Sequence, residues 1–180
     1  MYRLFVAIDL PNEVRDAVAG IAGRELVGAR LVPREQLHLT LRFIGDADEA
    51  QYHAIKKALD RAKVAVFSLT LKDVGHFPPG RRPRVLWVGM EESAPLRVLQ
   101  QEVELALVGA GVPPEERGFS PHITIARLKE TPPGKIMALE EKYHQFSAGP
   151  FSVEEFYLYS STFTREGAVH KREAVYRLSA

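Results

Sequence analysis

The stretch His38-Leu39-Thr40-Leu41 recurs 84 residues later as His122-Ile123-Thr124-Ile125, and this repetition governs how the rest of the chain is interpreted. Phe67-Ser68-Leu69 returns as Phe151-Ser152-Val153 at the same offset. The apolar helical positions also repeat, as 52, 55, 59 and 62 in the first half and 136, 139, 143 and 146 in the second. A fixed offset is the signature of a repeated structural unit. The pattern predicts two α+β halves facing each other, although similar strand–helix–strand units without a common origin would also produce it.

Hydrophobic periodicity divides the chain into short strands and helices. Helices are expected after Pro11, along 52–62, after a capping Ser93, and over 136–146. The expected strands cover 3–10, 37–44, 66–74, 84–90, 121–128, 151–161 and 169–178, the last two as a candidate hairpin. No linker is long enough to separate independent domains. We therefore expect one domain over 1–180, with repeat units at about 3–75 and 84–160 and a closing strand at 169–178.

Composition excludes several classes of protein. The chain has 180 residues, of which 46% are hydrophobic and 26% charged, as in ordinary globular proteins. Its net charge of +1 argues against nucleic-acid binding over the whole surface, but leaves room for a small basic cleft. The absence of cysteine excludes disulfides, thiolate zinc sites, iron–sulfur clusters and cysteine nucleophiles, and fits a reducing cytoplasm.

The ends of the chain carry no targeting signal that we can identify. Residues 3–10 form an apolar run that is too short for a signal peptide and lacks a cleavage site. No stretch approaches the roughly 20 apolar residues of a membrane helix. A cytoplasmic protein without a membrane partner is therefore expected, and the length and near-neutral charge suit a monomer.

The repeated motif places polar side chains on one face of each strand. Residues i and i+2 of a strand share a face, so His38 and Thr40 point one way while Leu39 and Leu41 point into a core. The same alternation pairs His122 with Thr124. If a pseudo-two-fold axis relates the halves, the two pairs face each other across a shared cleft.

A cleft of this kind suits displacement at phosphorus. Two imidazoles can serve as general base and general acid at neutral pH. Two threonine hydroxyls can hold the oxygens of a phosphoryl group. No metal or other cofactor is required by this chemistry. Two histidines without nearby carboxylates are also too few for a typical zinc site, and a single His-x-Thr is usually structural.

Other histidines and aromatic residues give weaker signals. Phe5 and Trp87 are expected in the core, whereas Phe43 and Phe77 fit either a core position or a position that stacks on a base. The remaining histidines show no partner pattern and are expected at surface or structural positions: His53, His76, His144 and His170.

Arginines near the motifs offer candidate phosphate contacts. Arg127 lies five residues after His122, so ideal alternation places it on the opposite face, unless a bulge or the strand end redirects it to the cleft. It fits a phosphate contact and a solvated strand-end charge equally well. The loop at 76–84 carries Arg81, Arg82 and Arg84 without an acid, which suits either an RNA backbone or a solvated loop.

The two motifs with their flanks resemble the paired H-x-T-x signatures of the 2H phosphoesterase superfamily. The nearest branch is the RNA 2′,3′-cyclic phosphodiesterases, also named 2′-5′ RNA ligases. The resemblance extends to Arg3–Pro11, His38–Gly45, Pro83–Gly89 and Pro121–Arg127, and thus to nearly the whole chain. It implies a bilobal, duplicated α+β fold with pseudo-two-fold symmetry. In that fold antiparallel sheets line a central cleft and helices pack outside.

The resemblance also implies an activity: metal-independent opening of an RNA terminal 2′,3′-cyclic phosphate to a 2′-phosphate, with reversible 2′-5′ joining of RNA ends in some members. On this basis His38 is the proton donor to the departing 3′ oxygen and His122 is the proton acceptor that activates water, although exchanged roles fit the sequence equally well. Thr40, Thr124 and Arg127 bind the phosphate. The expected partner is RNA with 2′,3′-cyclic phosphate ends, tRNA fragments among them.

Two other functional hypotheses rest on the same residues. A related 2H phosphodiesterase could act on a cyclic nucleotide or on a 2′-5′ oligonucleotide with the same catalytic groups. A non-catalytic module that binds RNA ends would keep the cleft without the chemistry. Both motifs are intact, which favours an enzyme.

Overall fold

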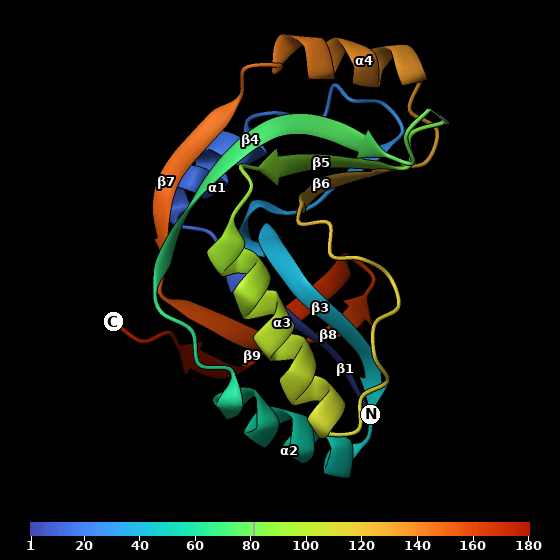
Figure 1. Cartoon of the computed structure of the whole chain (residues 1–180). Helices are drawn as coiled ribbons and strands as arrows, with labels where there is room; N and C mark the ends of the chain where they lie inside the picture. The colour runs from blue at the N-terminus through green and yellow to red at the C-terminus, as the bar shows by residue number, and fades with distance from the viewer. Residues whose placement is uncertain (81) are drawn as a thin grey trace.

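The computed structural model describes residues 1–80 and 82–180, so Arg81 of the predicted basic loop lies outside the described residues. Two antiparallel sheets make up the fold, with strand orders β3-β1-β8-β9 and β2-β6-β5-β4-β7 (Figure 1). The strands are β1 (Tyr2–Asp9), β2 (Ala29–Leu31), β3 (His38–Ala47), β4 (Phe67–Phe77), β5 (Val85–Met90), β6 (Ile123–Leu128), β7 (Ser147–Val153), β8 (Glu155–Thr164) and β9 (Gly167–Arg177). The predicted fold class is confirmed.

Four α-helices are described on the outer faces of the sheets. They are α1 (Asn12–Ala19), α2 (Glu49–Ala58), α3 (Ala94–Gly109) and α4 (Pro133–Lys142), with short 3-10 turns at Arg34–Gln36 and Leu59–Arg61. Ser93 caps α3 as expected, because its hydroxyl accepts a hydrogen bond from the Leu96 amide. Helices α2 and α3 cover the β3 side, whereas α4 packs against β4. None of these helices is long and apolar enough to cross a membrane.

The two halves of the chain exchange elements. Helix α1 follows β1 of one sheet and packs against β7 of the other, while α3 follows β5 and packs against β3. Leucine, isoleucine and valine side chains of both sheets and of the helices form one continuous core. Each sheet is therefore covered in part by a helix that follows a strand of the other sheet.

The repeated segments pair with each other. Ser68 of β4 lies opposite Ser152 of β7, with Phe67 opposite Val153 and Leu69 opposite Phe151. A two-fold axis through the Ser68–Ser152 pair would exchange the two segments. The division into repeat units at 3–75 and 84–160 and their common origin stay predictions.

One predicted element was wrong. The expected strand over 151–161 is two strands, β7 and β8, which lie in different sheets and are separated by Glu154. The cause is a change in which residues are buried. In β7 the buried residues Phe151 and Val153 have odd numbers, whereas in β8 the buried residues include the even-numbered Phe156 and Leu158. A change of phase in the two-residue alternation turns the chain to a new sheet.

Gly75 provides a test of how tightly the second sheet is packed. It lies opposite Trp87, and a Cβ atom at this position would overlap the indole ring. We predict that Gly75→Ala lowers the free energy of unfolding by about 1–3 kcal/mol in urea denaturation, because the rigid ring must move. Gly134→Ala is the control, since open space surrounds that position in α4. Equal unfolding midpoints for the two variants would contradict the packing.

Candidate active site

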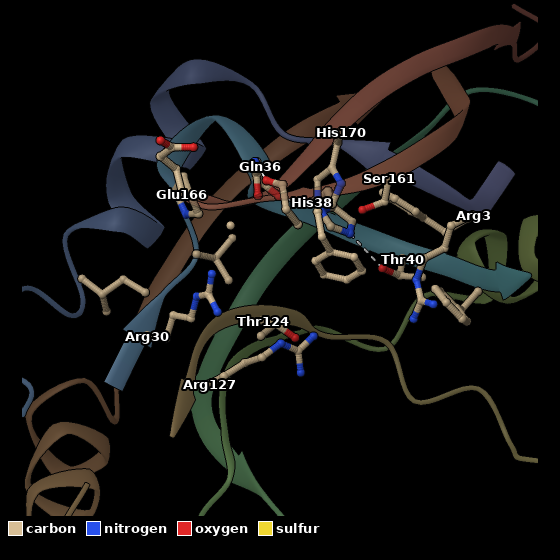
Figure 2. Close-up of a pocket in the computed structure, with 18 of the residues that line it drawn as sticks. Arg3, Arg30, Gln36, His38, Thr40, Thr124, Arg127, Ser161, Glu166 and His170 are labelled. Atoms are coloured by element: carbon tan, nitrogen blue, oxygen red, sulfur yellow. Dashed lines mark hydrogen bonds between the residues drawn. The ribbon is translucent and has the colours of Figure 1, made fainter. Parts of the chain in front are cut away.

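The two motifs border a single cleft between the sheets. His38 and Thr40 come from β3, while Thr124 comes from β6 in the opposite sheet and His122 immediately precedes that strand. These four residues and Arg127 line a cavity of about 500 Å³. Figure 2 shows His38 and Thr40 on one side of the cleft, with Thr124 and Arg127 on the other. The fold thus brings together all five residues that the sequence singled out. Their roles stay predictions.

Both histidines are held by the same local contact. The Nδ1 of His38 lies 2.6 Å from the carbonyl oxygen of Gln36, and the Nδ1 of His122 lies 2.8 Å from that of Ser120. A carbonyl oxygen only accepts, so Nδ1 carries a hydrogen and donates it in each case. In the neutral ring this leaves the lone pair on Nε2. Nε2 is therefore the atom that can take a proton or, once protonated, give one.

An aromatic ring packs against each of the two imidazoles. Phe5 lies against His38 with ring centroids 5.1 Å apart, and Phe77 lies edge-on to His122 at the same separation. His170 of β9 also meets the His38 ring edge-on, at 5.8 Å. Within residues 1–80 and 82–180, His38 has a further polar contact that His122 lacks, because the Nε2 of His38 lies 2.9 Å from the Thr40 hydroxyl. The two histidines therefore occupy similar but unequal environments.

Burial is the main influence on the protonation of His38. It lowers the pKa of the His38 imidazole below its ordinary value of 6.5, because the charged form loses hydration. The hydrogen bond to Gln36 and the charge of Asp9 oppose this effect, while Arg15 and a protonated His122 add to it. The lowered pKa favours the neutral form of the His38 imidazole in the free protein. An anion bound in the cleft would favour its protonated form.

A bulge in each motif strand places an additional residue on the cleft. In β6, Thr124 lies opposite Trp87 and Ala126 lies opposite Leu86, so Ile125 has no partner. Because the extra residue resets the alternation, Arg127 points to the same side as Thr124. The bulge that Arg127 needed in order to face the cleft is thus present.

The first motif is built in the same way. The pairing of β3 with β1 leaves out Leu41, and Phe43 then faces the cleft at the position that Arg127 occupies in the second motif. Residues 38–43 and 122–127 have the same succession of buried and accessible positions. Phe43 is 48% exposed, so of its two expected positions the core is wrong.

Sequence reasoning missed several cleft residues. His170 was expected at a surface or structural position, yet it lines the cleft beside His38. Arg3 and Arg30 also line it, as do Ser161, Phe163 and Glu166 of the β8–β9 hairpin. No local pattern marks these residues, because they reach the site only through strand pairing and hairpin packing.

The other candidates lie elsewhere. His53 contacts Glu49, His76 contacts Glu140, and the His144 ring contacts a backbone carbonyl, as expected of surface or structural histidines. Among the cleft-lining residues in the described part of the chain, Arg82 and Arg84 are absent. Within residues 1–80 and 82–180, no group of three or more His, Asp or Glu side chains is arranged to hold a metal ion.

Two antiparallel sheets that present paired His-x-Thr motifs to one cleft define a 2H phosphoesterase. The chain belongs to the 2′-5′ RNA ligase superfamily, whose family model matches residues 10–162. The resemblance expected from the two motifs is thus confirmed.

Curated relatives span nearly the whole chain. Proteins named RNA 2′,3′-cyclic phosphodiesterase from Archaeoglobus fulgidus and Thermotoga maritima are 33% and 36% identical over 172 and 174 residues. Each alignment covers 94% of this chain, and 96% and 91% of the respective relative. The crystal structure of E. coli LigT complexed with 3′-AMP is 30% identical, with a TM-score of 0.77 and 99% coverage of both chains. These relatives confirm the expected class of enzyme, a phosphodiesterase.

The protonation of His38 can be measured directly. We predict that NMR titration gives His38 a pKa below 6.5 and that His170→Ala raises it, because water then reaches the ring. As pH falls from 6.5 to this lowered pKa, the unfolded chain binds the proton before the folded one, so stability decreases. His53→Ala, at an exposed position, is the control. A pKa above 6.5 in the free protein would contradict the burial argument.

Proposed function

We propose that this protein hydrolyses the 2′,3′-cyclic phosphate at the end of an RNA chain to a 2′-phosphate. The observation that carries the proposal is the pair of imidazoles on opposite walls of one cleft, each anchored through Nδ1 and each beside a threonine. This arrangement supplies a base on one side of a phosphorus atom and an acid on the other. The names of the relatives supply the substrate class.

In the proposed mechanism, the Nε2 atom of His122 takes a proton from water as the water oxygen attacks phosphorus. The bond between phosphorus and the 3′ oxygen breaks, and the Nε2 atom of His38 gives its proton to that oxygen. The phosphate stays on the 2′ oxygen. A general acid must begin protonated, and burial opposes this for His38 in the free protein. The phosphate anion of the substrate offsets that effect once it is bound.

The remaining predicted residues act on the phosphate itself. The hydroxyls of Thr40 and Thr124 lie on the two walls and donate to the non-bridging oxygens, on which charge accumulates in the transition state. Arg127 adds a planar pair of donors that suits a phosphate. No metal ion is needed, because the histidines move the protons and these donors carry the charge. A 5′ hydroxyl in place of water would give 2′-5′ joining by the same steps.

The activity test uses a short RNA with a 2′,3′-cyclic phosphate end in the presence of EDTA. We predict a 2′-phosphate product, and a fall in kcat of about 10²- to 10⁴-fold for His38→Ala and for His122→Ala. Thr124→Val should also slow the reaction, whereas Thr124→Ser keeps the hydroxyl and serves as the matched control. Loss of activity in EDTA that a divalent ion restores would refute the metal-free mechanism. Binding without turnover would favour a module that recognises RNA ends.

The assignment of acid and base has a separate test. A substrate whose departing 3′ oxygen is replaced by sulfur needs no general acid, because a thiolate leaves readily. We predict that His38→Ala regains most of the wild-type rate on this analogue, whereas His122→Ala does not. The opposite result would exchange the two roles. Steady-state rates of both variants on the oxygen and sulfur substrates provide the comparison.

A further inference from the structure

Two arginines stand side by side on one wall of the cleft. Arg30 of β2 lies directly opposite Arg127 of β6 in the antiparallel register, so their side chains share a face. Both line the cleft, and Figure 2 shows both reaching into it, with Arg30 on the other side of His38 from Arg3. Like charges placed directly opposite each other destabilise a sheet. A bound anion that is not part of the protein would reduce this repulsion.

No described carboxylate neutralises this pair of arginines. Among the described residues, no carboxylate lies within ion-pairing distance of Arg30 or Arg127. Glu166 is the single acid among the cleft-lining residues that the structure describes, and it forms no ion pair with either arginine. Arg3 is the other described arginine of the cleft, whose lining residues include no lysine in the described part of the chain. The cleft is therefore positively charged in a protein whose net charge is only +1.

Arg30 is set apart from Arg127 by its place in the fold. Strand β2 is the edge of its sheet, so Arg30 lies one strand further out than the motif strand β6. Its guanidinium crosses toward the opposite sheet and rests against Gly167 of the β8–β9 hairpin, where a Cβ atom would lie 2.8 Å from Nη2. Arg30 thus reaches across the cleft on the far side of β6's motif residues. A second anionic group of the substrate, next to the reacting phosphate, would contact the Arg30 guanidinium.

We propose that Arg30 binds the phosphate on the 5′ side of the terminal nucleotide, while Arg127 binds the cyclic phosphate that reacts. This inference rests on the proposed function and names its substrate more closely. In RNA the neighbouring phosphate is the anion that always accompanies a terminal nucleotide. A free nucleoside 2′,3′-cyclic phosphate lacks it. The preferred substrate is therefore an RNA end.

The test compares two substrates that differ in one group: adenosine 2′,3′-cyclic phosphate with and without a 5′-phosphate. Wild-type protein should show the lower KM for the 5′-phosphorylated compound. Arg30→Ala should raise that KM about tenfold and leave the KM for the unphosphorylated compound unchanged, because only the former offers a charge-assisted contact to Arg30. Arg30→Lys, which keeps the charge, should recover part of the loss. Arg127→Ala should slow the hydrolysis of both compounds.

Controls separate this contact from general charge and from folding. Arg61→Ala removes an equally charged, exposed residue that does not line the cleft, and it should change neither KM. On a longer RNA, Arg30→Ala should also reduce the salt dependence of KM by the share of one phosphate contact. Thermal unfolding of each variant checks that the fold is kept.

The outcomes are distinct. If wild-type protein turns over neither compound nor RNA, the proposed function has failed. If it turns over both compounds with equal KM, or if Arg30→Ala leaves the difference in KM intact, the role of Arg30 is refuted while the activity stands. An equal loss on both compounds would place Arg30 on the reacting phosphate and would also refute this inference.

Discussion

The alternation of side chains along a β strand, reset by a bulge just after each motif threonine, is the constraint on which the cleft depends. In each motif the histidine and threonine face the cleft, and the residues between and directly after them are buried. The bulges at Leu41 and Ile125 then allow two consecutive buried residues, so that the third residue after each threonine returns to the cleft. Without the bulges, Phe43 and Arg127 would point into the core.

Pairing between the halves determines how the two motif strands face each other. The segments around Ser68 and Ser152 form an antiparallel pair, and α1 and α3 each cross to the sheet of the other half. These contacts set two similar histidines on opposite walls, each held by a carbonyl oxygen two residues earlier in the chain. For displacement at phosphorus this geometry is useful, because the attacking and leaving oxygens lie on opposite sides of the reacting atom.

The symmetry is incomplete, and the differences concern chemistry rather than folding. One motif places Phe43 where the other places Arg127, and only His38 packs against another histidine. Burial lowers the pKa of His38. A symmetric cleft would offer two equivalent imidazoles, whereas this one separates them by environment and places Arg30 and Arg127 together on one wall. Distinct acid, base and phosphate-binding roles become possible through these departures.

The sequence by itself determined the repeat, the two α+β halves and the four residues of the motifs, because strand alternation and helix periodicity are local properties of the chain. Only the tertiary structure decided the face of Arg127 and the places of Arg30 and His170. A bulge depends on the partner strand. Strand β2 pairs with the distant β6, and β9 is brought to the cleft because its hairpin partner β8 pairs with β1.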